Sequence, residues 1–245
     1  MKARIVCIVQ ARMGSVRLPG KSMMPLAGKP LVERVIRRIK DVPILDDVIL
    51  VTSELPENDV LFELALSLGV PVIRGDEENL ASRYVSAIEE LDIDVVVRIP
   101  ADNYLTESWA VNLIVEEHLK YRSGFSTNIM QIFDSGFPDG LGAEVFEATD
   151  FLKLHSESCP KDVDEHVHKH FFDYNSGLAT MIAQDQIRTI KCPDRFAWPQ
   201  LRFDVNTLED YQFAAMIYED LGGDKGKFGL IEALDWHKRN KPIGN

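Results

Sequence analysis

The stretch IVCIVQARMGSVRLPGKSMMPLAGK, residues 5–29, sets the expected fold, and the rest of the chain is organised around it. It opens with the apolar run Ile5 to Val9, which is short and β-branched and therefore typical of a buried strand. A basic, glycine-containing loop follows, with Arg12, Gly14, Ser15, Arg17, Gly20 and Lys21. Glycines let backbone N–H groups approach a phosphate and fixed cations stabilise its charge, so this order indicates a triphosphate site.

The loop matches neither G-x-x-x-x-G-K-[ST] nor G-x-G-x-x-G, and composition alone leaves open a merely solvated surface loop. The order of its residues, QARMGSVRLPGK, closely resembles the signature loop of the cytidylyltransferases that activate acidic sugars, especially the branch similar to spore-coat polysaccharide biosynthesis proteins. In that family the loop binds the triphosphate of CTP. The resemblance implies a nucleotide site that contains Ala11, Arg12, Met13, Gly14, Ser15, Arg17 and Lys21.

Composition bounds the class of protein. A chain of 245 residues with 45% hydrophobic content can bury one substantial core, so we expect one domain over residues 1–245. The net charge of −12 argues against a nucleic-acid partner, which needs clustered cations. Three cysteines without C-x-x-C spacing indicate reduced thiols, and there is no run of about 18 apolar residues for a membrane span. We therefore expect a cytoplasmic protein with no membrane partner.

Strands and helices are expected to alternate after the basic loop. The expected helices cover 30–40, 57–68, 79–91 and 107–121, and the expected strands cover 47–53, 70–74 and 94–99. This alternation predicts an α/β fold with a doubly wound, mainly parallel sheet. The resemblance implies the Rossmann-like, GT-A-like nucleotidyltransferase fold. In such folds the ligand lies outside the carboxyl ends of the strands, where the basic loop begins.

From residue 124 the apolar pieces become shorter, which indicates a small inserted lobe around 124–200 for acceptor binding or dimerisation. Segments 178–182 and 187–191 are expected to pair as a hairpin. Relatives of the family use such an arm to dimerise, so the resemblance implies a homodimer. The last expected elements are a strand over 202–205 and helices over 207–221 and 230–239, with Thr207 and Asp210 as a capping-box variant.

Two aspartates are the candidate metal ligands. A triphosphate site needs a divalent cation, and Mg²⁺ prefers one or two carboxylates plus substrate oxygens. Asp102 follows the apolar run 95–99 and Asp204 lies in a later apolar run, although an aspartate there is also commonly a turn or cap residue. Segments 98–102 and 203–210 resemble the family's R-x-x-G-D and D-x-x-T-x-E-D motifs, whose first aspartates contribute to metal binding. The resemblance implies Mg²⁺ as cofactor and a catalytic set of Arg12, Lys21, Asp102 and Asp204, and we expect Lys21 and Asp204 to face solvent.

The chain departs from the family pattern near these motifs. Ala101, a nucleotide-site candidate, replaces a glycine; Asn103-Tyr104 replace Cys-Pro; and Gly142 replaces the last acid of P-D-G-L-D. The changes at 101–104 alter the surroundings of the nucleotide or the acceptor, and the change at Gly142 puts the usual acceptor in doubt more than the usual nucleotide. A histidine cluster at 166–170 overlaps residues 164–167, a segment comparable to the family's R-E-H-V near its acceptor pocket, with a surface helix as the alternative. The acceptor-site candidates are Asn103, Tyr104, Asp139, Glu144, Glu165 and His166.

Residues 74–84 resemble the family segment near the cytosine and ribose, RG-x-x-x-D-V-L-x-R-Y. Ser82 and Arg83 are therefore nucleotide-site candidates that present hydrogen-bonding groups to a pyrimidine. In the alternative, Glu77 and Glu78 only favour the start of a helix and Arg83 pairs with them. Thr52 and Ser53, at the end of an expected strand, are also nucleotide-site candidates. Two roles are open for their hydroxyl groups: contact with the ligand, or capping of the next turn.

Four motifs in the family's order, over residues 5–221, imply a nucleotidyltransferase. An oxygen of an acidic sugar, or of a phosphate- or phosphonate-bearing acceptor, attacks the α-phosphorus of CTP and releases pyrophosphate, in the biosynthesis of surface polysaccharide or another glycan precursor. One alternative is a glycosyltransferase of the same fold, but its D-x-D motif follows a strand, whereas Asp92-Ile-Asp94 precedes one. The other is an inactive nucleotide-binding protein, which the changes at Ala101 and Gly142 leave open.

Overall fold

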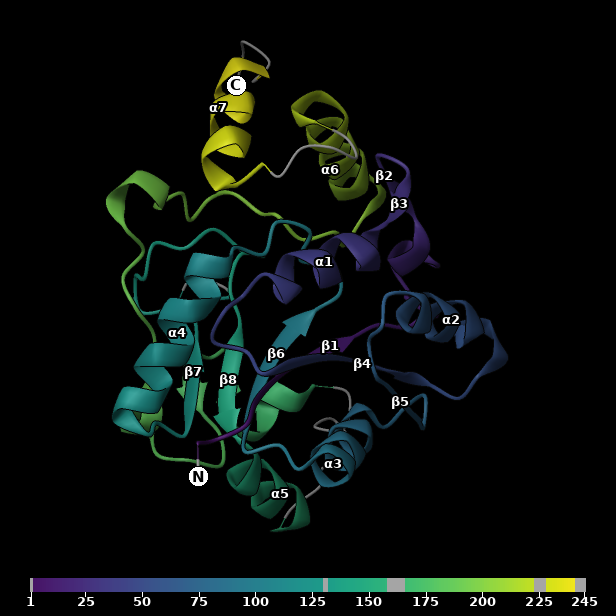
Figure 1. The fold of residues 1–245 in the computed structure, drawn as a ribbon. Coiled ribbons are helices and arrows are strands. Elements are labelled where there is room, and N and C mark those ends of the chain that lie inside the picture. Colours follow the sequence, from purple (N-terminus) through teal and green to yellow (C-terminus); the bar gives the residue numbers. More distant parts are fainter. Residues whose placement is uncertain (1, 130–131, 158–165, 223–227, 241–245) are drawn as a thin grey trace.

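The computed structural model describes residues 2–129, 132–157, 166–222 and 228–240. In this part of the chain a seven-stranded sheet has the order β11-β7-β8-β6-β1-β4-β5 (Figure 1). The strands are β1 (Ile5–Gln10), β4 (Asp47–Ser53), β5 (Val72–Gly75), β6 (Val95–Pro100), β7 (Phe125–Thr127), β8 (Glu144–Glu147) and β11 (Ile187–Arg188). Every pair is parallel except the two that β8 makes with β6 and β7. The predicted mainly parallel α/β sheet is confirmed.

Helices cover both faces of the sheet because its buried strands are apolar on both sides. The helices are α1 (Leu31–Lys40), α2 (Asp59–Ser67), α3 (Leu80–Leu91), α4 (Ser108–Tyr121), α5 (Ala148–Glu157), α6 (Leu208–Leu221) and α7 (Leu230–Asn240). Along β1, Cys7 and Val9 pack with α1, α2 and α4, whereas Val6 and Ile8 pack with α3 and α5. A third apolar cluster joins α6 and α7 to the loops beyond the sheet (Figure 1).

The expected helices and the expected strands up to residue 99 differ from the observed ones by at most two residues at either end. The capping box at the start of α6 is confirmed: the backbone N–H of Asp210 donates to Thr207 Oγ1 at 3.3 Å, and that of Thr207 donates to Asp210 Oδ2 at 2.7 Å. No described helix combines the length and the apolar character that crossing a membrane requires.

The expected hairpin over 178–191 is wrong. β10 (Leu178–Ala179) pairs instead with β9 (Phe172–Asp173), through a turn at Gly177, which has φ +71°. β11 pairs in parallel with β7, because residues 184–186 form a 3-10 helix that separates it from β10. The region 124–200 thus adds β7, β8 and β11 directly to the central sheet. The homodimer stays a prediction, and the hairpin arm over 178–191 no longer supports it.

The expected strand over 202–205 is also wrong. This segment makes a single parallel bridge, between Arg202 and Asp139. Its backbone donors go to two different loops: Phe203 N–H binds the Asp139 carbonyl at 2.9 Å and Val205 N–H binds the Asp102 carbonyl at 3.0 Å. The side chains of Phe203 and Val205 are buried in the third cluster. The segment therefore connects the loop that contains Asp102 to the loop that contains Asp139 through backbone hydrogen bonds, whereas a strand would pair with one neighbouring strand.

A buried histidine makes folding sensitive to acid. His118 in α4 is fully buried, and its Nδ1 lies 3.0 Å from Ser126 Oγ. Burial, helped by the nearby Arg122 cation, lowers its pKa from 6.5 to about 4. The unfolded chain therefore binds a proton that the folded chain does not, and stability falls as the pH drops from about 6.5 to about 4.

His118 is expected to lower the free energy of unfolding by roughly 3 kcal/mol over this pH range, because each unit of pKa difference corresponds to about 1.36 kcal/mol. His118→Asn keeps an acceptor near Ser126 but does not titrate, so its stability is expected to fall less than the wild type over this pH range. Urea unfolding of both proteins at pH 8, 6 and 4.5 measures the difference. Parallel pH curves for the two proteins would contradict the prediction.

Candidate active site

A cavity of about 480 Å³ lies at the carboxyl ends of β1 and β6. Its volume falls in the range of pockets that bind small molecules and cofactors. Of the predicted site residues, those that line it are Ala11, Arg12, Ser15, Arg17, Lys21, Arg83, Ala101, Asp102, Asn103, Asp139, Glu144, His166 and Asp204. The structure thus brings together residues from the basic loop, from the α3 start and from both predicted metal segments.

The basic loop folds back on itself before it presents its lysine. Gly20 adopts φ +73°, a conformation that glycine accepts without strain, and its N–H binds the Met13 carbonyl at 2.9 Å. Lys21 then begins a short 3-10 helix and extends to Asp102 and to the Val205 carbonyl, the latter at 2.7 Å. Lys21 therefore joins the basic loop to both predicted metal segments.

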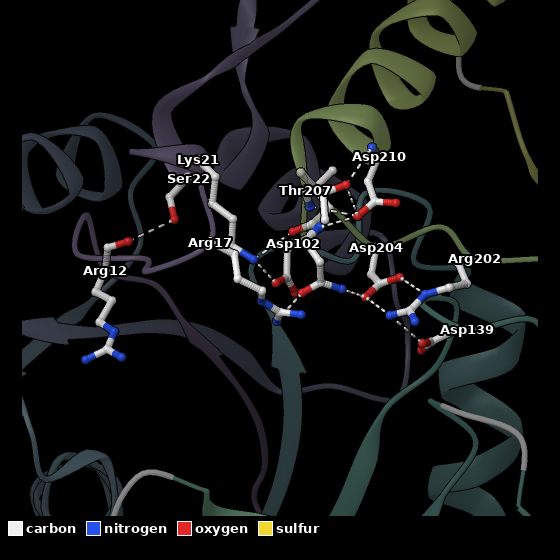
Figure 2. A network of polar contacts seen from close by, with 12 residues as sticks. Arg12, Arg17, Lys21, Ser22, Asp102, Asp139, Arg202, Asp204, Thr207 and Asp210 are labelled. Carbon is white, nitrogen blue, oxygen red and sulfur yellow. Dashed lines mark hydrogen bonds and ion pairs between the residues drawn. The ribbon is translucent and has the colours of Figure 1, made fainter. Parts of the chain in front are cut away.

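Figure 2 shows a cluster of carboxylates held by cations. Arg202 binds Asp204 through two parallel hydrogen bonds of 3.1 and 2.9 Å and also lies 3.3 Å from Asp139. Asn206 donates to Asp204 and accepts from Arg17 at 2.5 Å. We expected Lys21 and Asp204 to face solvent. Both side chains are instead largely buried, because each is held within this network.

The cluster carries more negative charge than its surroundings easily stabilise. Burial and the adjacent charge of Asp204 raise the pKa of Asp139 to about 7, against the opposing effect of Arg202. Asp102 contributes in the same direction. A cation bound here would relieve this repulsion.

Carboxylates are the donor set that suits magnesium. In the described part of the chain, no group of three or more His, Cys, Asp or Glu side chains is arranged to hold a metal ion. Mg²⁺ needs fewer protein ligands, because it keeps waters and takes the rest of its oxygens from substrate phosphates. Asp102 and Asp204, beside the basic loop, fit that requirement, and Mg²⁺ stays a prediction.

Arg12 lines the cavity but lies apart from the carboxylate cluster (Figure 2). Its Nη1 donates to Glu77 Oε1 at 3.0 Å. Of the two cations in the expected catalytic set, Lys21 contacts Asp102, whereas Arg12 binds Glu77. Arg12 is held on the side where α3 begins, because Glu77 is its ion-pair partner.

The floor of the cavity is a polar network across four strands. Arg98 on β6 binds Glu144 on β8 at 2.5 Å and Gln10 on β1 at 2.9 Å, and both members of the ion pair are buried. Tyr174 donates to Glu144 at 2.9 Å and contacts Thr127 on β7 at 2.8 Å. Mutual attraction and these hydrogen bonds stabilise charges that burial alone would make unfavourable.

Several predicted residues do not reach the cavity, and Glu165 lies outside the described residues. Ser53 accepts from Asn58 Nδ2 at 2.8 Å and from the Leu55 N–H, so it caps the turn after β4. Thr52 is fully buried beside it. Ser82 Oγ donates to the Asn79 carbonyl at 2.8 Å. For Ser53 the alternative, in which the hydroxyl caps the turn, describes the geometry, and the Ser82 hydroxyl is bound within its own helix turn. Thr52 Oγ1 has no hydrogen-bond partner among the described residues, so Thr52 neither lines the cavity nor caps the turn.

Three further predicted site residues do not reach the cavity because of their packing. Tyr104 is 1% exposed and packs against Phe203 and Tyr218 in the third cluster, which leaves it no contact with an acceptor. Met13 packs against the core that contains α1, and Gly14 lies beside Glu77 without lining the cavity. Asn103, in contrast, lines the cavity, and its buried Nδ2 has no partner among the described residues.

The histidine cluster is not the surface helix of the alternative reading. His166 lines the cavity and precedes a 3-10 helix over 167–170. His168 also lines the cavity, and burial lowers its pKa to about 4. His170 is fully buried against Phe151.

Sequence reasoning missed several cavity residues, namely Gln10, Glu77, Arg98, His168, Tyr174, Arg202 and Asn206. A usable signal existed for two of them. Arg98 is a charge inside an apolar run, and a buried charge needs a partner. Arg202 lies two residues before a predicted metal ligand. Tyr174 carried no such signal, because its segment forms neither a regular helix nor a long strand.

The departure at Gly142 has a packing explanation. A Cβ built at Gly142 would lie 2.0 Å from Asn128 Oδ1, so no side chain fits there. Asn128 uses the space to accept from the Ala143 N–H at 2.9 Å and to donate to the Ala110 carbonyl at 2.8 Å. In this chain the Asn128 amide occupies the place where a longer side chain at position 142 would project.

Gly140 lets two site loops approach each other. It adopts φ +85°, and a Cβ there would lie 2.6 Å from the backbone of Phe203 and 2.9 Å from the Asp204 nitrogen. Gly140→Ala is therefore expected to push the 202–204 segment away from Asp139 and to lower turnover at least about tenfold, since small displacements of site groups cost this much or more. Gly28→Ala is the control, because Gly28 also has positive φ but no atom within 4 Å of the added Cβ. Equal effects of the two substitutions on turnover would contradict the prediction.

The fold and the site together define a class. A basic loop after the first strand, a lysine directed at carboxylates, and an α/β sheet with its cavity at the carboxyl ends of the strands are typical of proteins that bind nucleoside triphosphates. Carboxylates beside the phosphate-binding loop are typical of enzymes that transfer phosphoryl-type groups.

A family model described as cytidylyltransferase matches residues 6–193. The chain belongs to the cytidylyltransferase family, whose members are nucleotidyltransferases. It is 28% identical over 223 residues to the spore coat polysaccharide biosynthesis protein SpsF of Bacillus subtilis, covering 89% of this chain and 88% of that protein. The family resemblance stated from the motifs is confirmed.

Solved structures agree with this assignment. A cytidylyltransferase from Leptospira borgpetersenii serovar Hardjo-bovis superimposes with a TM-score of 0.84 at 25% identity, covering 100% of both chains. CMP:2-keto-3-deoxy-manno-octonic acid synthetase, solved in complex with CTP, shares the fold with a TM-score of 0.62 at 17% identity, covering 89% of this chain and 100% of that one.

Proposed function

We propose that this protein uses CTP and Mg²⁺ to transfer CMP to a small acidic acceptor, either an acidic sugar or a phosphate- or phosphonate-bearing molecule. The single observation that carries the proposal is the contact of Lys21, from the phosphate-binding loop, with Asp102 and the Val205 carbonyl inside one cavity. That contact puts a cation from the basic loop beside Asp102 and in contact with the segment that carries Asp204, the two carboxylates that suit a divalent metal. The family membership supports CTP as the donor.

In the proposed reaction an acceptor oxygen attacks the α-phosphorus of CTP, and the bond between the α-phosphorus and the bridging oxygen of the β-phosphate breaks. Pyrophosphate leaves with that electron pair, and the nucleophile's proton passes to a site carboxylate or to solvent. Mg²⁺, when bound, neutralises charge on the phosphate oxygens. Lys21 and Arg17 would hold the phosphates, and Asp102 and Asp204 would hold the metal. Positioning and electrostatics supply most of the acceleration in such transfers.

The related Bacillus protein supports a role in polysaccharide precursor synthesis, since spore coat polysaccharide biosynthesis stands in its name. The rival glycosyltransferase gains no support at its candidate motif. Asp94 accepts from the Arg4 N–H at 2.7 Å, beside the first residues of β1 and β6. These are the amino ends of β1 and β6, whereas the cavity lies at their carboxyl ends.

A screen for acceptor-dependent pyrophosphate release tests the proposal. The protein is incubated with Mg²⁺ and CTP, with UTP and ATP as controls, against nonulosonic acids, sugar phosphates and phosphonates. Release that requires CTP and one of these acceptors is the expected result. Absence of release with every acceptor would contradict an active cytidylyltransferase, and transfer from a supplied nucleotide sugar without CTP would favour the glycosyltransferase.

A further inference from the structure

Arg202 joins two carboxylates at the cavity wall (Figure 2). Its Nε and Nη2 donate to Asp204 Oδ1 and Oδ2 at 3.1 and 2.9 Å, and Nη2 also lies 3.3 Å from Asp139 Oδ2. Parallel hydrogen bonds from a guanidinium to a carboxylate are among the stronger polar contacts in proteins. One cation therefore serves two acids, and it is bound more closely to Asp204.

Asp204 has little capacity left for a further positive group. Its Oδ1 accepts from Arg202, and its Oδ2 accepts from both Arg202 and Asn206. A carboxylate oxygen accepts about two hydrogen bonds, so a metal ion has access only to the second position on Oδ1. There it would lie beside the guanidinium, and two positive charges at that separation repel each other. By contrast, Lys21 binds Asp102 at Oδ2, and no described residue donates to Asp102 Oδ1.

Asp139 offers the Arg202 guanidinium a second position. The Asp139 backbone is bonded on both sides of residue 202: its N–H donates to the Leu201 carbonyl at 3.1 Å, and its carbonyl accepts from the Phe203 N–H at 2.9 Å. These bonds keep the Asp139 carboxylate beside Arg202. The Arg202 side chain is 56% exposed, whereas those of Asp139 and Asp204 are 18% and 11% exposed. The cation is thus the member of this group that has room to move.

We propose that Arg202 competes with the metal for Asp204, and that metal binding moves its guanidinium from Asp204 to Asp139. This inference rests on the proposed function, in which Asp204 is a metal ligand. It adds a residue that controls how tightly the metal is held. The displaced charge stays within the cluster because Asp139 receives it, so no cation has to be expelled to solvent.

A purely structural role for Arg202 predicts the opposite effect on metal affinity. If Arg202 only orients Asp204 for the metal, removal of the guanidinium weakens metal binding. If Arg202 competes for the Asp204 oxygens, its removal strengthens metal binding. The sign of the change therefore separates the two roles without any measurement of turnover.

Mn²⁺ binding to the protein without nucleotide, followed by electron paramagnetic resonance of free Mn²⁺, measures this sign. Arg202→Met keeps the side-chain length and removes the cation, and we expect it to bind Mn²⁺ at least about tenfold more tightly than the wild type. Arg202→Lys keeps the charge but cannot bind both oxygens in parallel, and at least about threefold tighter binding is expected. Arg195→Met is the matched control, because Arg195 stacks on Phe196 and does not line the cavity. Its affinity is expected to stay within about twofold of the wild type.

Asp139→Asn tests the second position. It removes the carboxylate that receives the guanidinium, so we expect it to weaken Mn²⁺ binding at least about tenfold in the wild type, but no more than about threefold in the Arg202→Met background. Equal effects in the two backgrounds would overturn the transfer of Arg202 to Asp139.

Asp204→Asn identifies the site at which Mn²⁺ binds, and thermal melting confirms that each variant is folded. Unchanged or weaker Mn²⁺ binding in Arg202→Met would overturn this inference, and so would wild-type affinity in Arg202→Lys, which would assign the effect to net charge alone. The proposed function would then still stand if CTP and an acceptor release pyrophosphate. Wild-type Mn²⁺ binding that Asp204→Asn leaves unchanged would instead contradict the metal assignment in the proposed function. If Arg202→Met does not fold, Arg202→Lys carries the test.

Discussion

Lys21→Ala is expected to lower the rate of pyrophosphate release at saturating CTP by about 10²–10³-fold, as removal of one preorganised charge-stabilising donor does. Lys21 Nζ contacts Asp102 and the Val205 carbonyl, so it lies where charge builds on the leaving pyrophosphate in the proposed reaction. The variant also leaves Asp102 without its cation, and we expect it to lose about 1–3 kcal/mol of unfolding free energy. The acceptor found by the screen serves as second substrate.

Lys29→Ala is the control for Lys21→Ala, because it removes the same charge from the same part of the chain. Lys29 contacts Glu33 at 3.4 Å and does not line the cavity. Its turnover is expected to stay within about twofold of the wild type, because Lys29 lies outside the cavity and its ion pair with Glu33 is only partly buried. If both variants keep wild-type turnover, Lys21 has no part in the reaction.

Glu144→Ala is expected to lower the free energy of unfolding by about 3–5 kcal/mol, the cost of breaking a buried ion pair from one side. Arg98, only 6% exposed, would keep its charge without the carboxylate that lies 2.5 Å away. Tyr174 would lose its acceptor in the same substitution. Urea unfolding followed by circular dichroism measures the change.

A double variant separates charge from packing at this site. Arg98→Met combined with Glu144→Leu replaces both charges by apolar groups, and it is expected to recover most of the stability that Glu144→Ala loses. With Arg98→Met and Glu144→Leu also measured as single variants, the interaction energy from the double-mutant cycle is expected to be large and favourable to the pair. A loss below about 1 kcal/mol in Glu144→Ala would show that water reaches Arg98 and that the pair is not buried in solution.

The sheet and its helices were predictable because local patterns determine them. Residues 31–39 have apolar side chains at helical spacing, which predicts α1 directly. The β-branched run in β1 predicts a strand in the same way. The misassigned pieces, 178–191 and 202–205, are short and draw their partners from distant loops. No local signal encodes that choice, since a short apolar run does not reveal what it pairs with.

The candidate site was predictable where a motif carries it. Lys21, Asp102 and Asp204 lie in segments whose residue order is specific, and the structure places them in one cavity. Tyr104 and Thr52 share those segments or strand ends but point into packed surroundings, which adjacency in sequence does not distinguish. Tyr174 becomes visible only when the fold brings its segment to the strand ends.

The contacts that close the cavity span nearly the whole chain: Lys21 and Val205 are 184 positions apart, and Arg17 and Asn206 are 189 apart. Every strand of the central sheet precedes residue 202. At about 5–20 residues per second, a ribosome therefore finishes the nucleotide pocket roughly 10–40 s after β1 has been made. A nascent or cleaved chain that ends before Arg202 carries all the sheet strands and still lacks Asp204, one of the two acids that we propose for magnesium.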